Sequence, residues 1–247
     1  MVLHLCENIL KAFRSDDRRD DLYRSLYALP TYCYFNRIKV EEFDSLLNLE
    51  QEIMNAKGKD KRYIEEKVLE ILSRVSFEGK KQGPDTMILR VRFLKTVDER
   101  QRQLIAAKLK GFALQIFSMK KVRDAYNSKR KGFALTMLGN IAVAYDCPEA
   151  SEKCLLALRS KKKDLISAAF EFLETHYVEH DYQLPPDIIE ELDKITEQTK
   201  DRSIAVGALD IQIQTGEINE LAALSRIDDW KERNYSGREM SNDFVNL

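Results

Sequence analysis

The chain has 247 residues, and its 40 basic and 41 acidic side chains leave a formal net charge of −1. Hydrophobic residues make up 44% of the sequence, which excludes a chain that is disordered by composition. No apolar run approaches the ~20 residues of a transmembrane helix, so we expect no membrane span. Only 9 glycines and 5 prolines are present, too few to turn many short strands, and this favours an all-helical fold.

The N-terminus and the cysteines indicate a cytoplasmic protein. Residues 1–13 alternate apolar and polar side chains at helical spacing, whereas a secretory signal needs a basic start and a continuous apolar stretch. The cysteines at positions 6, 33, 147 and 154 show no C-x-x-C spacing. They are therefore predicted to be buried free thiols rather than disulfides or metal ligands, and no cofactor is expected.

In chain order, the first hundred residues predict a series of short amphipathic helices. One apolar stripe covers 3–13 and contains Leu3, Cys6, Ile9, Leu10 and Phe13. A second covers 22–27 and contains Leu22, Leu26 and Tyr27, followed by an aromatic stretch after Pro30. Further helices are predicted over 40–53 and 64–75, separated by a polar loop. Pro84-Asp85 then predicts the start of a helix that holds Ile88, Leu89, Val91, Phe93 and Leu94.

From about residue 100 onward one pattern recurs. Two adjacent apolar or small residues are followed four positions later by two more, and an apolar residue closes the turn. The pattern covers Phe133–Ile141, Leu165–Leu173 and Ile204–Ile211, and a weaker copy starts at Leu104, so the starts are 29, 32 and 39 residues apart. Each full copy precedes a second predicted stripe, whose residues are Ala150, Cys154, Leu155 and Leu158, then Ile188, Ile189, Leu192 and Ile195, then Ile218, Leu221, Ala222 and Leu224.

Helix pairs that repeat every 30–40 residues or so are typical of an α-solenoid, in which neighbouring pairs share a continuous core. Through the three patterned segments the chain resembles HEAT and armadillo repeats, although the proline and the aspartate-arginine pair of HEAT units are mostly missing. The resemblance implies a scaffold with a protein-binding surface. We predict an N-terminal helical region over 1–99, HEAT-like repeats over 100–235 and a tail over 236–247. A plain helical bundle is the alternative fold.

Charge is unevenly distributed along the chain. Residues 57–163 carry 26 basic and 12 acidic side chains, whereas residues 164–247 carry 7 basic and 19 acidic ones. The basic residues gather at three predicted turns, at Lys120, Lys121 and Arg123, at Lys129, Arg130 and Lys131, and at Arg159, Lys161, Lys162 and Lys163. Equivalent turns line up in a solenoid, so these residues are predicted to form a basic ridge for an acidic protein, a nucleic acid or an anionic membrane surface. Solvated helix ends, or neutralisation by the acidic last third, are the alternatives.

One segment has the pattern of a catalytic site. His176, Glu179 and His180 fit the H-x-x-E-H motif of inverted zinc peptidases, in which two histidines on one helix face hold zinc. The segment runs into a turn, and little chain follows it to supply the distant glutamate ligand of that family. We therefore interpret it as a polar helix end, with a zinc-dependent hydrolase as a distant alternative.

The sequence as a whole predicts a non-catalytic protein that binds another protein through a helical surface. Nucleic-acid binding through the basic ridge is the alternative function. No glycine-rich phosphate loop or nucleophile elbow is present to indicate an enzyme.

Overall fold

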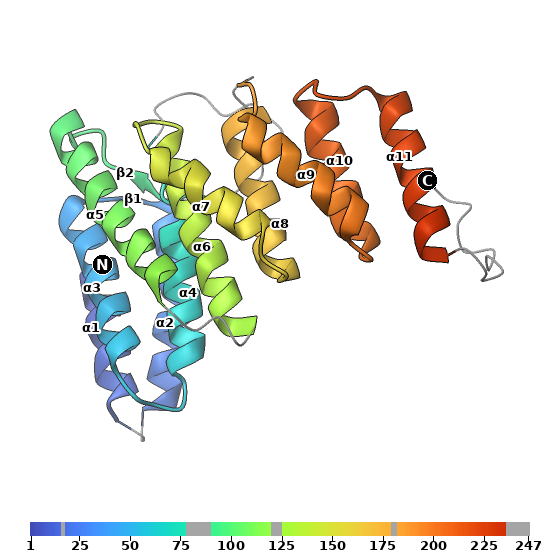
Figure 1. Ribbon diagram of the computed structural model, residues 1–247. Helices are drawn as coiled ribbons and strands as arrows, with labels where there is room; N and C mark the ends of the chain where they lie inside the picture. Colours follow the sequence, from blue (N-terminus) through green and yellow to red (C-terminus); the bar gives the residue numbers. More distant parts are fainter. Residues whose placement is uncertain (16–17, 78–89, 120–124, 179–181, 236–247) are drawn as a thin grey trace. The chain divides into compact units, whose positions relative to one another are not determined.

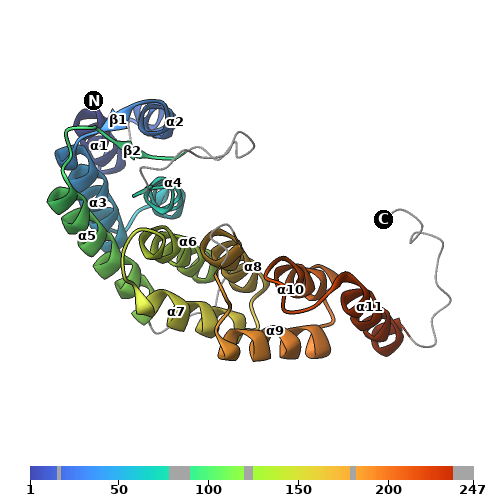
Figure 2. The same ribbon diagram turned by 90° about the horizontal axis from the view of Figure 1, so that it is seen from above.

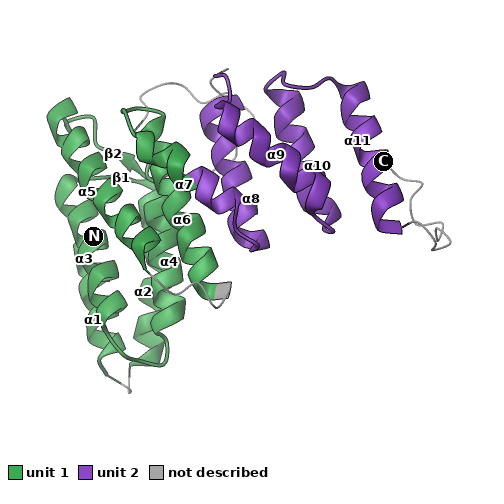
Figure 3. Ribbon diagram, viewed as in Figure 1, with its two compact units in different colours: residues 1–153 green, residues 154–247 purple. Residues whose placement is uncertain are grey.

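This computed structural model describes residues 1–15, 18–77, 90–119, 125–178 and 182–235. They form an almost entirely helical protein, as the sequence predicts (Figure 1). The chain divides into two compact units, Met1–Lys153 and Cys154–Leu247 (Figure 3). In the described ranges, no helix combines the length and the apolar character that crossing a bilayer requires.

Among its described residues, the first unit contains six complete helices. These are α1 (Val2–Phe13), α2 (Arg19–Phe35), α3 (Val40–Asn55), α4 (Lys61–Ser73), α5 (Glu99–Ser118) and α6 (Ala125–Ala142). Helix α7 (Pro148–Leu158) begins in this unit and ends in the second. Local chemistry fixes some of the boundaries: Asp98 and Gln101 form a reciprocal capping box at the start of α5, which satisfies amide groups that otherwise lack a partner.

The six helices of the first unit lie in two rows. Helix α1 packs on α2, α3 on α4 and α5 on α6. Helices α1, α3 and α5 contact one another in order, and so do α2, α4 and α6 (Figure 2). Each helix therefore buries one face between the rows. In α1 that face holds Val2, Cys6, Ile9 and Ala12, whereas Leu3 is exposed. The buried face of α1 is therefore rotated about the helix axis relative to the predicted stripe.

The prediction of a helix that starts at Pro84-Asp85 is wrong for residues 90–94, which the structure describes. Residues 85–89 lie outside the described ranges, but Arg92–Phe93 forms strand β2, which pairs in parallel with β1 (Arg37–Ile38). Val91 also bridges Val75 at the end of α4. Burial alternates here, with Val91 and Phe93 inside and Arg92 outside, and this is the period of a strand. Aromatic contacts hold the segment, since the Phe93 ring lies 6.0 Å from Phe43 and 6.2 Å from Phe77.

Helix α2 does not end at Pro30 but continues to Phe35. Pro30 has no backbone N–H, so one hydrogen bond of the helix is missing. Leu29 and Cys33 are buried on either side of it, and their packing keeps the segment helical. The aromatic stretch at 32–35 thus belongs to the last turn of α2.

The second unit contains the end of α7 together with α8 (Lys163–Leu173), a five-residue π-helix (Glu174–Val178), α9 (Pro186–Gln198), α10 (Arg202–Gln214) and α11 (Glu220–Tyr235). Helix α10 packs on α8, α9 and α11. The apolar positions predicted in α8 and α10 are buried throughout, from Leu165 to Leu173 and from Ile204 to Ile211. Asp201 caps α10 by accepting hydrogen bonds from the amides of Ser203 and Ile204.

The stripe predicted for the last helix is wrong. Leu221 and Leu224 are 77% and 59% exposed, and Ala223 and Trp230 are instead the buried residues of α11. Trp230 is fully buried, and its indole Nε1–H donates a hydrogen bond to the carbonyl oxygen of Thr199 at 2.7 Å. The tryptophan is therefore a packed residue that joins α11 to the end of α9.

All four cysteines are buried and free, which confirms that prediction. Burial raises the pKa of the Cys6 and Cys33 thiols to about 12. It raises the pKa of Cys147 and Cys154 as well. The native thiols therefore stay protonated and unreactive at neutral pH.

Candidate functional site

Three tyrosines gather on the row formed by α2, α4 and α6. Tyr23 and Tyr27 lie one turn apart on α2 and are 37% and 68% exposed. The Tyr23 ring lies 5.9 Å from the ring of Tyr63 on α4. A hydrogen bond with the Tyr27 hydroxyl raises the pKa of Tyr63. The opposite face of α2 is buried through Leu22, Leu26, Leu29 and Cys33, and this packing directs the tyrosines outward.

A cation lies close to this cluster, on the neighbouring position of α4. Arg62 is exposed, and its guanidinium carbon lies 5.1 Å from the ring centre of Tyr126 on α6. The guanidinium of Arg130 lies 5.8 Å from the same ring. Both distances are within the range of cation–π attraction. The contact of Arg62 with Tyr126 therefore joins α4 to α6, and the contact of Tyr23 with Tyr63 joins α2 to α4.

A buried ion pair lies between α4 and α6. A guanidinium nitrogen of Arg130 lies 2.8 Å from a carboxylate oxygen of Glu65, and their side chains are 9% and 0% exposed. The Tyr126 hydroxyl donates a hydrogen bond to the other Glu65 oxygen. Burial, followed by this hydrogen bond, raises the pKa of Tyr126 above its ordinary value. Tyr126 thus connects the exposed Arg62 to the buried Glu65 carboxylate.

A second buried carboxylate, Glu50 of α3, faces the same pair. Neither of its oxygens has a hydrogen-bond partner among the described residues, and the side chain is fully buried. Burial raises the pKa of Glu50 well above its ordinary value of 4.5, and the charge of Glu65 raises it further. The charges of Arg130 and Lys61 act in the opposite direction. The folded state therefore holds a proton on Glu50 more tightly than the unfolded chain does.

Replacing Glu50 with glutamine is expected to make the stability of the first unit less dependent on pH. Because the folded-state pKa of Glu50 is raised, its stabilising contribution is fully present below the ordinary value of 4.5. That contribution is lost as the pH rises through the folded-state pKa. Urea unfolding between about pH 4 and about pH 8, followed by circular dichroism, should show E50Q gaining stability relative to the unmodified chain as the pH rises.

The control for this experiment is Glu52→Gln on the same helix, because Glu52 is exposed and paired with Arg14. It should show no such gain. An E50Q difference that stays constant across the pH range would contradict a raised pKa at Glu50.

The residues predicted to form a basic ridge have varied surroundings. Lys120, Lys121 and Arg123 lie outside the described residues. Lys129, Arg130 and Lys131 lie in the first turns of α6 rather than in a loop. Lys129 pairs with Glu66, and Arg130 is the buried partner of Glu65. The Lys131 ammonium lies 5.8 Å from the ring centre of Phe117, and burial lowers its pKa.

The remaining ridge residues lie in the second unit. Arg159 pairs with Glu191 at 3.0 Å, and Lys163 pairs with Asp201 at 2.8 Å. The hydrogen bond from Lys163 lowers the pKa of Asp201 to about 2. Lys161 and Lys162 are exposed, and neither has an ion-pair partner among the described residues. The two clusters at 129–131 and 159–163 belong to different units, and one ridge that contains both stays a prediction.

The H-x-x-E-H segment is described only in part. His176 lies in the π-helix that follows α8, and its ring stacks on Phe172 at 5.4 Å and meets Tyr177 edge-on at 4.7 Å. Glu179 and His180 lie outside the described residues. Over the described ranges, no group of three or more His, Cys, Asp or Glu side chains is arranged to hold a metal ion.

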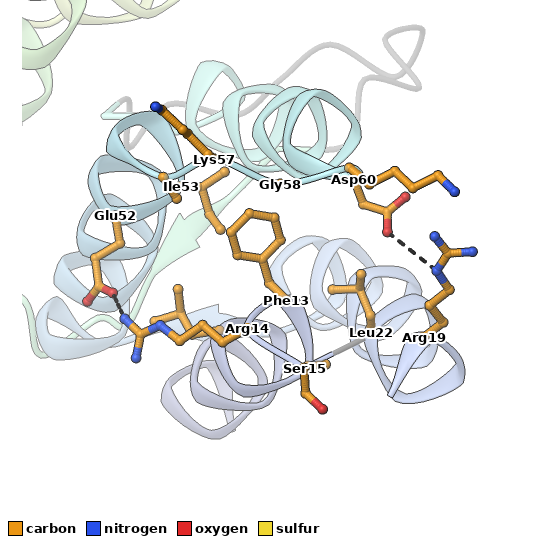
Figure 4. A pocket seen from close by; sticks show the side chains of 14 residues that line it. Phe13, Arg14, Ser15, Arg19, Leu22, Glu52, Ile53, Lys57, Gly58 and Asp60 are labelled. Atoms are coloured by element: carbon orange, nitrogen blue, oxygen red, sulfur yellow. Dashed lines mark hydrogen bonds and ion pairs between the residues drawn. The ribbon is translucent and has the colours of Figure 1, made fainter. Parts of the chain in front are cut away.

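The first unit also contains a pocket of about 350 Å³. Its walls come from the end of α1, the start of α2 and the connection between α3 and α4 (Figure 4). The Phe13 ring occupies the centre of the view, with Arg14 on one side and Arg19 on the other. Sequence reasoning missed this pocket because its lining residues come from three separate segments.

Sequence reasoning also missed the tyrosine cluster. It assigned Tyr27 to the buried stripe of α2, where the structure buries Cys33, Leu29 and the two leucines before it. The four-residue spacing of Tyr23 and Tyr27 was the available signal, because such residues share a helix face. The contribution of Tyr63 depends on how α2 and α4 pack and has no local signal.

No protein-family model matches this chain, and neither a curated protein nor a solved structure is significantly similar to it.

Proposed function

We propose that this chain is a non-catalytic scaffold that binds a partner protein through the row formed by α2, α4 and α6. The observation that carries the proposal is the cluster of exposed Tyr23 and Tyr27 with the half-buried Tyr63, which the exposed Arg62 precedes on α4. Tyrosine and arginine are enriched at the centres of protein interfaces, where they account for much of the binding energy. The ring contact of Tyr23 with Tyr63 and the hydrogen bond of Tyr27 with Tyr63 hold the tyrosines in place before a partner arrives, which lowers the entropic cost of binding.

We further propose that the helices of the first unit are helical repeats of the solenoid type. The order in which the helices pack supports this. The first helices of successive pairs, α1, α3 and α5, contact one another in turn, and so do the second helices, α2, α4 and α6. In repeat proteins the second helices often line a common binding surface, and the tyrosine cluster lies on that row.

Nucleic-acid binding is the second candidate. It is favoured by exposed Lys161 and Lys162, and by the mixture of aromatic and basic side chains at Tyr63 and Arg62, which single-stranded nucleic acids also contact. Its affinity must come mainly from phosphates and so must fall steeply with salt. A filter-binding assay with generic RNA and DNA at low salt tests it, and no retention of either would remove this candidate.

Replacing Tyr27 and Tyr63 together with alanine is expected to weaken partner binding at least tenfold. Each tyrosine at the centre of an interface contributes on the order of 1–2 kcal/mol, so the pair exceeds the 1.4 kcal/mol that corresponds to tenfold. The full chain is used to capture proteins from a cell lysate. A partner identified by mass spectrometry is then purified and titrated against the variant.

Tyr182→Ala is the matched control, because Tyr182 is a half-exposed tyrosine of the second unit. The partner should bind this variant as it binds the unmodified chain. If the double variant binds that partner with unchanged affinity, or if Tyr182→Ala weakens binding equally, the α2–α4 face is not the site.

A further inference from the structure

The pocket at the end of α1 has an apolar floor. Leu22 and Ile53 are almost fully buried beneath it, and the half-buried Phe13 ring lies between them (Figure 4). A volume of about 350 Å³ falls within the range of small-molecule sites. Because Leu22 and Ile53 are almost fully buried, the Phe13 ring supplies the apolar surface that the floor offers to a ring or short chain of a bound molecule.

The backbone of the α3–α4 connection fixes the position of this ring. A Cβ atom at Gly58 would lie 2.5 Å from Cζ of Phe13, which is closer than such atoms approach in proteins. Any larger residue at this position would require the Phe13 ring to move. The contact between the Phe13 ring and the Gly58 backbone therefore forms part of the pocket wall.

The rim of the pocket is rich in cations. Arg14, Arg19, Lys57 and Lys59 line it, against the two carboxylates of Glu52 and Asp60. The Arg14–Glu52 pair is mostly exposed at 2.6 Å, and the Arg19–Asp60 pair is long at 3.9 Å. Lys57 and Lys59 have no ion-pair partner among the described residues. Exposed pairs are weak, so an incoming anion competes for both arginines.

We propose that this pocket binds a small organic anion. Its apolar part rests on Phe13, and its phosphate or carboxylate group is held by Arg19 and Arg14, whose planar guanidinium groups suit such oxygens. Neither the floor nor the rim binds the anion tightly by itself, because the floor carries no charge and the rim cations are solvated. The site is separate from the tyrosine face and does not depend on the proposed partner protein.

Phenyl phosphate, inorganic phosphate and benzyl alcohol are the probes that test this. Each is titrated into the full-length ¹⁵N-labelled chain while the amide signal of Gly58 is followed by NMR. Phenyl phosphate is expected to shift this signal saturably, and the other two probes to bind at least about tenfold more weakly, since each lacks one of the two recognised parts. Equal affinity for inorganic phosphate or for benzyl alcohol would overturn the proposal, as would the absence of any saturable shift.

Arg19→Glu and Arg100→Glu form a matched pair, because each changes the net charge equally and only Arg19 lines the pocket. Arg19→Glu is expected to weaken phenyl phosphate binding about tenfold or more, and Arg100→Glu by less than about twofold. Ser15→Trp, which fills the pocket from its rim, is expected to abolish binding while the circular dichroism spectrum stays unchanged. Equal effects of the two charge changes, or full binding by the Ser15 variant, would place the anion elsewhere.

Discussion

Arg130→Met is expected to lower the free energy of unfolding of the first unit by about 3–5 kcal/mol. The substitution removes the cation that lies 2.8 Å from Glu65 and leaves that carboxylate fully buried without a charge partner. It also removes one of the two cations, Arg130 and Lys61, that oppose the rise in the pKa of Glu50. Urea unfolding followed by circular dichroism measures the change, and Trp230 fluorescence follows the second unit separately.

Lys129→Met is the matched control, because Lys129 is the next residue of α6 and its pair with Glu66 is largely exposed. This variant should lose no more than about 1 kcal/mol. Combining Arg130→Met with Glu65→Leu should recover most of the loss, since an apolar pair of similar volume avoids the desolvation of two charges. Similar losses for Arg130→Met and Lys129→Met would show that burial does not distinguish the two ion pairs.

Trp230→Ala is expected to destabilise the second unit by about 3–5 kcal/mol. The indole is the largest fully buried side chain, so its removal leaves a cavity between α11 and the end of α9. The Thr199 carbonyl also loses the hydrogen bond that it accepts from Nε1. Thermal unfolding followed by circular dichroism measures the loss, because the variant has no tryptophan fluorescence.

Leu221→Ala is the control for this experiment. It truncates a large side chain on the same helix, but Leu221 is 77% exposed, and the change should stay within about 0.5 kcal/mol. Trp230→Phe keeps most of the volume and should cost less than the alanine variant. If Trp230→Ala and Leu221→Ala have equal effects, α11 does not depend on its buried face.

The apolar periodicity of the sequence predicted most helices because each one buries a single stripe. It succeeded fully in α8 and α10, where every patterned position is inside. It was wrong for Val91–Phe93, since the strand there depends on pairing with residues more than fifty positions earlier along the chain. It was also wrong for α11, where Leu221 and Leu224 are exposed and the buried Trp230 packs the helix against the rest of the unit.

The residues of the candidate site were harder to predict from the sequence than the helices. Counting charges along the chain located Lys129, Arg130 and Lys131 correctly as a basic run. It gave no sign that Glu65 and Glu66, more than sixty residues away, pair with the first two of them. Whether a charge is solvated, paired or buried depends on tertiary packing, and the same holds for the tyrosines that α2 and α4 bring together.

The burial of all four native thiols has a practical consequence for locating a partner. Maleimide reagents attack thiolates, which are scarce when burial raises the pKa of a cysteine to about 12, as it does for Cys6 and Cys33. A single cysteine placed at an exposed position such as Tyr27 or Tyr182 is therefore labelled ahead of the native ones. A fluorescent or crosslinking probe can thus be attached at one surface position in each of a series of single-cysteine variants. Each probe reports whether a partner contacts its own position.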